Sequence, residues 1–175
     1  MAHMSFVART HPQQGPANHI DDREITHADW LPLQERFRFT IDACAAAHNN
    51  KLPSFWTAQD NCLIQSWTGH RVWCNPPYSN IRPFVAKALQ FEADLSVLLL
   101  PSNRTEQTWW QDLVEPHRDR QLGLSVEFLP GRLRFLAAQD TKIKPNSRPP
   151  FGCVLLIIGP VNHGIPVPSV QGQLL

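Results

Sequence analysis

The tetrapeptide Asn75-Pro76-Pro77-Tyr78 is the part of the sequence whose residue types and spacing point most directly to chemistry. The side-chain carbonyl of Asn75 and the main-chain carbonyl of Pro76 are two hydrogen-bond acceptors. The two prolines restrict the backbone, so both acceptors can converge on one amino group, while Tyr78 offers a flat ring for stacking. Such a group can hold an aromatic amine while it attacks an electrophile, by positioning and electrostatics rather than through a general base.

The elements expected to position this tetrapeptide are the strands of an open α/β sheet. Residues 71–74 form a compact apolar segment that the prolines terminate, which predicts a strand ending at Asn75. The alternating segment 37–41 predicts a second strand, which ends at Asp42. Residues 95–100 are a continuous apolar run of the kind found in a central parallel strand. Because ligands bind at the carboxyl ends of such strands, we expect Asn75 and Asp42 to share one site.

The rest of the chain predicts a single α/β domain over residues 26–159. Thr26 is a possible cap of a short helix that Pro32 limits in length, and residues 1–25 are expected to form a flexible arm, of which 1–4 resemble a cloning scar. An irregular tail is expected over residues 160–175. The patterns further predict helices over 81–93 and 105–114 and strands over 55–57 and 151–158, with either two short strands or a strand and a turn over 125–129 and 132–135.

The composition excludes few classes of function. The 175 residues suffice for one domain, and 16 basic against 15 acidic residues give a net charge of +1, which argues neither for nor against nucleic acid. No apolar run reaches the ~20 residues that span a bilayer, and the start lacks a secretory pattern, so we expect an intracellular protein without a membrane partner. The four cysteines form no Cys-x-x-Cys pair and are expected to be buried free thiols, with no metal site.

A chain of ordered motifs resembles the phage-type DNA N6-adenine methyltransferases, a small Dam-like family. The resemblance covers most of the chain, from about Asp29 to Ile158, and includes the tetrapeptide in its strand context. The matching segments are Phe39-Thr40-Ile41-Asp42-Ala43-Cys44-Ala45, Asn50-Lys51, Phe55-Trp56-Thr57 with Asp60, Trp67, Val72 to Ser79, Phe84-Val85-x-Lys87-Ala88, Leu99-Leu100-Pro101, Thr105, Trp109-Trp110, Gly131-Arg132-Leu133-x-Phe135 and Asn146-Ser147.

The resemblance implies a Rossmann-like S-adenosylmethionine-dependent methyltransferase fold, with a largely parallel sheet and an antiparallel last strand. It implies methyl transfer from S-adenosylmethionine to the N6 amino group of adenine in DNA, in a bacterial cytoplasm and as protection from host restriction. The target base would have to leave the stack. The implied catalytic residues are Asn75, Pro76, Pro77 and Tyr78; the cofactor residues are Asp42, Ala43, Cys44, Asn50, Asp60 and Asn75; the expected DNA contacts are Arg82, Lys87, Arg104, Arg132 and Arg148.

Two departures from larger methyltransferases keep other functions open. No Gly-x-Gly loop follows the first strand, and only 33 residues separate Asp42 from Asn75, so one strand–helix unit is expected to be shortened. The alternatives are a methyltransferase acting on cytosine N4, RNA adenine or a protein glutamine, and a non-catalytic module that binds DNA or protein on a degenerate fold. Binding of the cofactor separates the module from the enzymes.

Overall fold

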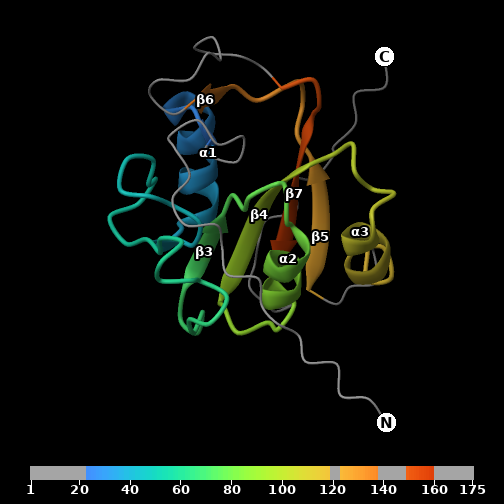
Figure 1. The fold of residues 1–175 in the computed structure, drawn as a ribbon, viewed down its shortest axis with the longest axis horizontal. Helices are drawn as coiled ribbons and strands as arrows, with labels where there is room; N and C mark the ends of the chain where they lie inside the picture. The colour runs from blue at the N-terminus through green and yellow to red at the C-terminus, as the bar shows by residue number, and fades with distance from the viewer. Residues whose placement is uncertain (1–22, 119–122, 138–148, 160–175) are drawn as a thin grey trace.

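The computed structural model describes residues 23–118, 123–137 and 149–159, which form an α/β domain around one mixed sheet (Figure 1). Its strand order is β2-β3-β4-β7-β5. Strands β2, β3 and β4 pair in parallel, and β7 pairs antiparallel with both β4 and β5, so it alone runs against the others. The antiparallel last strand is therefore as predicted. The bounds are β2 Ile41–Asp42, β3 Arg71–Cys74, β4 Leu95–Pro101, β5 Leu124–Phe128 and β7 Cys153–Ile158.

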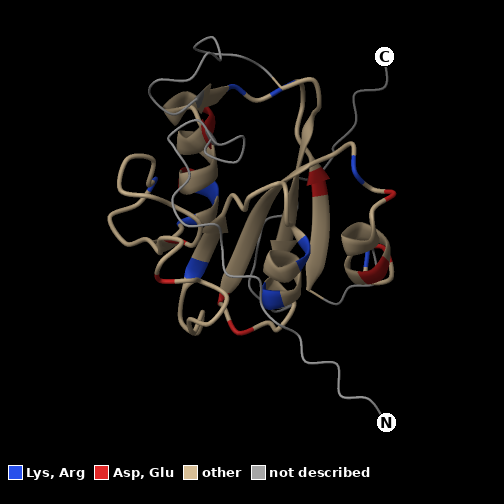
Figure 2. Cartoon of the chain, viewed as in Figure 1, with Lys and Arg blue, Asp and Glu red and all other residues tan. Residues whose placement is uncertain are grey.

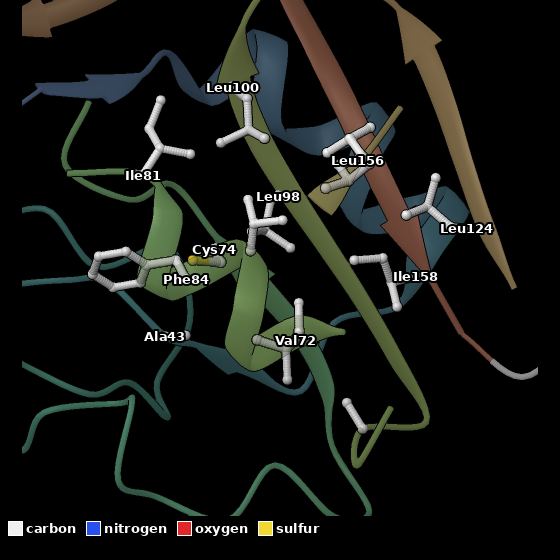
Figure 3. Close-up of a cluster of buried hydrophobic side chains, with 14 of the residues drawn as sticks. Ala43, Val72, Cys74, Ile81, Phe84, Leu98, Leu100, Leu124, Leu156 and Ile158 are labelled. Carbon is white, nitrogen blue, oxygen red and sulfur yellow. The ribbon is translucent and has the colours of Figure 1, made fainter. Parts of the chain in front are cut away.

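Alternation along the central strands divides the core into two layers. In β4, Leu98 and Leu100 point to one face of the sheet, while Val97 and Leu99 point to the other. The first face packs under helices α2 (Arg82–Ala88) and α3 (Thr108–Leu113), and Figure 3 shows part of that layer. The second face packs against helix α1 (His27–Phe37). Burial on both faces explains why the sequence of β4 is apolar without interruption.

Helix α1 is longer than predicted. Thr26 caps it by accepting a hydrogen bond from the Asp29 N–H, but the helix continues through the exposed Pro32 to Phe37 and ends at Arg38, whose φ is 51°. Its buried face, which includes Trp30, compensates for the hydrogen bond that the proline removes. The prediction of a strand over 37–41 was therefore wrong for its first residues, since β2 begins only at Ile41.

The connection between β2 and β3 contains no helix, in agreement with the short spacing between Asp42 and Asn75. Residues 43–70 form turns and bends. The strand predicted over 55–57 is reduced to a single parallel bridge between Phe55 and Asp42. The Trp56 N–H donates to the Asp42 carbonyl, and the Asp42 N–H donates to the Ser54 carbonyl. The loop therefore returns along the outer edge of β2 and covers the end of that strand.

A second, two-stranded sheet lies beyond the end of the main one (Figure 1). Strand β1 (Arg23–Ile25) pairs antiparallel with β6 (Phe135–Ala137) across more than 100 residues of sequence. The predicted arm over 1–25 is corrected at its end, because these last three residues form a strand. Residues 1–22 and the predicted tail, 160–175, lie outside the described residues. Over the described ranges no helix has the length and apolar character needed to cross a membrane.

Candidate functional site

A small pocket opens at the carboxyl ends of β2 and β3. Strand register places Asp42 beside Trp73, two residues before Asn75, so the two predicted site residues meet at one edge of the sheet. The open space, which includes solvent at its mouth, measures about 260 Å³. Its lining combines the strand ends with β1 and the loop after β2, and consists of Glu24, Ile25, Asp42, Cys44, Asn49, Lys51, Trp73 and Asn75.

Asp42 forms a buried carboxylate at this pocket. Its side chain is 3% exposed and accepts hydrogen bonds from the backbone N–H groups of Cys44 (3.3 Å) and Lys51 (3.0 Å). Burial raises the pKa of Asp42 from 3.8 to about 6, and the two backbone hydrogen bonds lower it in part. A carboxylate buried at this cost suits a site that receives a positively charged ligand.

A residue that follows β4, the strand next to β3, holds the tetrapeptide in place. After β4 ends, the guanidinium of Arg104 donates a 2.6 Å hydrogen bond to the Tyr78 carbonyl, and the Asn80 N–H closes a turn onto the Pro77 carbonyl. Pro76 is buried. Arg104, predicted to contact DNA, therefore positions the tetrapeptide from the β4–α3 loop.

Tyr78 lies partly buried rather than fully open to a stacking partner. Its ring centroid is 6.0 Å from that of Phe151 and 6.5 Å from that of Phe135, both in inclined arrangements. The buried Oη atom makes no hydrogen bond of ordinary geometry and lies beside the Cys153 thiol, and burial raises the pKa of the phenol well above its usual value. The aromatic contacts hold the Tyr78 ring against Phe135 and Phe151, and the Cys153 thiol is the polar neighbour of its hydroxyl.

We expect the variant Tyr78→Phe to be at least as stable as the wild type, by up to about 1 kcal/mol, because the hydroxyl it removes is buried and has only the Cys153 thiol, a weak hydrogen-bonding group, beside it. Chemical denaturation measures this difference. Tyr78→Ala is the contrasting variant, since it also removes the ring contacts with Phe135 and Phe151 and is expected to be destabilised. A clear loss of stability in Tyr78→Phe would show that the hydroxyl has a partner in solution.

Of the other predicted cofactor residues, only Cys44 lines the pocket. Ala43 is buried in the core, Cys44 lines the pocket, and the Asn50 side chain donates to the Leu52 carbonyl. Asp60 is exposed outside the pocket lining, where its carboxylate accepts from the N–H and hydroxyl of Thr57. These hydrogen bonds lower the pKa of Asp60 and hold the turn that follows residue 57.

Three of the four cysteines lie together, with Cys44 in the pocket lining and Cys62 and Cys74 buried next to it, which no sequence spacing indicated. The sulfur of Cys44 is 3.3 Å from that of Cys74 and 3.9 Å from that of Cys62. All four cysteines are free thiols; Cys62, Cys74 and Cys153 are buried as predicted, whereas Cys44 is only partly buried, and desolvation raises the pKa values of Cys44 and Cys74. In the described part of the chain, no group of His, Cys, Asp and Glu side chains has the arrangement of a metal site.

The predicted DNA contacts have different environments. Lys87 is only 9% exposed and pairs with Glu92 at 2.9 Å, so its position does not support a contact with DNA. Arg82 is exposed but pairs with Asp112 across α2 and α3, and Arg132 is exposed in the loop before β6. Arg148 lies outside the described residues. Figure 2 shows basic and acidic residues interspersed over the described chain.

The pocket also contains charged residues that were not in the predicted set, chiefly Glu24 and Lys51. Lys51 belongs to a matched motif. Glu24 falls at the end of the predicted arm, where no sequence pattern indicates a functional residue. Only the pairing of β1 with β6 brings it to the pocket. The structure thus defines an α/β protein with a pocket lined by charged residues at the ends of parallel strands, next to an Asn-Pro-Pro-Tyr loop.

Comparison with known proteins assigns the chain to a family. The family model for DNA N-6-adenine-methyltransferase (Dam) matches residues 24–171, and the chain belongs to this family. It is 38% identical over 77 residues to a DNA N-6-adenine-methyltransferase of Haemophilus phage HP1, covering 43% of this chain and 44% of the relative. It is 29% identical over 163 residues to one of Escherichia phage T1, covering 79% and 65%. The chain thus spans less than two thirds of either relative.

A likeness to a solved structure is weaker. A crystal structure described as that of a proposed RNA methyltransferase from Pyrococcus horikoshii aligns with 61% of this chain and 52% of its own. The TM-score is 0.39 and the sequence identity is 15%.

Proposed function

We propose that this protein transfers a methyl group from S-adenosylmethionine to the N6 amino group of adenine in DNA, on a Rossmann-like methyltransferase fold. The observation that carries the proposal is the meeting of Asn75 and the buried Asp42 at adjacent parallel strand ends, in one pocket. Membership of the adenine-methyltransferase family supports the choice of substrate.

The residues present fit the cofactor. S-adenosylmethionine carries two positively charged groups, a sulfonium and an ammonium. The pocket presents the buried Asp42 carboxylate, whose pKa is raised because burial disfavours its charge, and a cation would offset that cost. When bound, the cofactor supplies an activated methyl group. Asp42 would hold its methionine end, with Cys44 at the same wall and Asn50 fixing the adjoining loop. Asp60 remains a proposed contact for the cofactor's adenine.

The chain's own residues perform the positioning step. Asn75 and the Pro76 carbonyl accept the two hydrogens of the target amine, which favours a pyramidal nitrogen with its lone pair directed at the methyl group. The nitrogen becomes acidic only as it gains the methyl group and can then release its proton to water, so no strong base is needed beforehand. Arg104 holds the loop in place through the Tyr78 carbonyl, and Tyr78 would contact the extruded base.

DNA is the proposed macromolecular partner, and its contacts are assigned to exposed arginines. Arg132 is exposed near β6, and Arg82 is exposed at the start of α2. Since Arg82 already pairs with Asp112, a phosphate would have to compete with that carboxylate.

The experiment that tests the function is incubation with tritiated S-adenosylmethionine and unmethylated DNA, followed by digestion to nucleosides. We expect label in N6-methyl-2′-deoxyadenosine. Label in N4-methyl-2′-deoxycytidine would move the activity to cytosine. Absence of label from every nucleoside, with the cofactor bound, would overturn the proposed substrate. Absence of cofactor binding would favour a non-catalytic module.

A further inference from the structure

The pocket contains an ion pair that joins two distant parts of the chain. The Lys51 ammonium lies 2.5 Å from the Glu24 carboxylate, and their side chains are only 12% and 27% exposed. Glu24 comes from β1 and Lys51 from the loop after β2, and both line the same pocket as Asp42 and Asn75. The pair therefore lies beside the proposed catalytic loop, not on a remote surface.

Stability alone is a weak reason for such a pair. Removing two charges from water costs free energy that their attraction offsets only with good geometry and further hydrogen bonds. Glu24 is the one partner of the Lys51 ammonium among the described residues, although an ammonium has three donors. The lysine can therefore bind an additional acceptor without breaking the pair.

The charges around the pair match those of one ligand class. The Lys51 backbone N–H donates to Asp42, which joins Glu24, Lys51 and Asp42 into one network of two negative charges and one positive charge. The amino-acid end of S-adenosylmethionine carries an ammonium and a carboxylate, so it needs both an anionic and a cationic partner. Asp42 and Glu24 can accept from the ammonium, and Lys51 can donate to the carboxylate.

We infer that the Glu24–Lys51 pair recognises the amino-acid end of the cofactor, with Lys51 binding its carboxylate and Glu24 assisting Asp42 at its ammonium. The inference rests on the proposed function and adds to it two binding residues. It also assigns a task to β1: this strand, paired to β6, forms the wall that supplies the second carboxylate. The wall thus couples cofactor binding to the segment that carries Phe135, the neighbour of Tyr78.

The test compares two ligands by calorimetry in the full chain. S-adenosylhomocysteine has the amino-acid end, whereas 5′-methylthioadenosine has the same nucleoside and sulfur but lacks that end. In Lys51→Met, we expect affinity for S-adenosylhomocysteine to fall by about tenfold to a hundredfold, as for loss of a charged hydrogen bond. Affinity for methylthioadenosine should change by less than about twofold. Glu24→Gln should show the same selectivity with a smaller loss.

Lys87→Met is the matched control, because the Lys87 side chain is 9% exposed, close to the 12% of Lys51, and also pairs with a glutamate, but away from the pocket. It should leave both affinities unchanged. If Lys51→Met does not fold, the double variant Glu24→Gln/Lys51→Gln replaces the ion pair with a neutral hydrogen-bonding pair and should show the same selective loss.

Unchanged affinity for S-adenosylhomocysteine in Lys51→Met, or an equal loss for both ligands, would overturn the inference. If the wild type still methylates DNA in that case, the proposed function stands. A wild type that binds neither ligand would overturn the inference and the proposed cofactor together.

Discussion

Replacing Asn75 with alanine is expected to lower the rate of methyl transfer to DNA about a thousandfold, while affinity for S-adenosylhomocysteine changes by less than about threefold. The physical reason is that the amide oxygen acts on the target amine most strongly as charge develops on its nitrogen. Asn75 lines the pocket, but the charged groups proposed to bind the cofactor are Asp42, Glu24 and Lys51. The loss should therefore appear in kcat rather than in cofactor affinity.

Single-turnover transfer of the tritiated methyl group, together with calorimetry, measures both quantities. Asn80→Ala is the matched control, because it makes the same change at an exposed position on the loop that follows the tetrapeptide. It should retain nearly full activity and affinity. Full activity in Asn75→Ala would disprove the proposed mechanism, and an equal loss in Asn80→Ala would indicate a general disturbance of the loop.

The second large effect concerns the stability of the protein without ligand. Burial raises the pKa of Asp42 to about 6 in the folded state, above the 3.8 of a free aspartate. Between these values the folded protein binds the proton more tightly, so the carboxylate's contribution to the free energy of unfolding falls as the pH rises from 4 through 6. The full difference between the two pKa values corresponds to a loss of about 3 kcal/mol in the free energy of unfolding.

The variant Asp42→Asn removes this ionisation. It loses one acceptor for the Cys44 and Lys51 N–H groups, which costs stability at every pH. The difference in free energy of unfolding between this variant and the wild type should, however, shift in favour of the variant by about 2–3 kcal/mol as the pH rises from 4 to 7.5. Urea unfolding at several pH values measures the difference between the two proteins.

Asp60→Asn provides a control of opposite sign. Hydrogen bonds from Thr57 lower the pKa of the exposed Asp60, so its ionised form favours the folded state. That variant should lose stability relative to the wild type as the pH rises. Parallel pH curves for Asp42→Asn and the wild type would contradict the buried, costly carboxylate.

The sequence by itself was enough to predict that Asp42 and Asn75 lie together at one edge of the sheet. Two local signals carried this result: prolines stop a strand immediately after residue 74, and an apolar strand ends at Asp42. These signals are sufficient because the carboxyl ends of parallel strands lie at the same edge of the sheet, independently of the conformation of the loops. The uninterrupted apolar run at 95–100 likewise predicted a central strand, since burial on both faces leaves no polar position.

Only the tertiary structure decided the environment of each side chain. Burial of Trp30 against the sheet carries α1 through Pro32, which local propensity predicts as an end. Lys87 has the spacing of a helical surface residue, yet its ammonium is paired and buried beside Trp67. Glu24 reaches the pocket because β1 pairs with a strand more than 100 residues away. Contacts between distant segments leave no periodic or local pattern, so sequence spacing cannot reveal them.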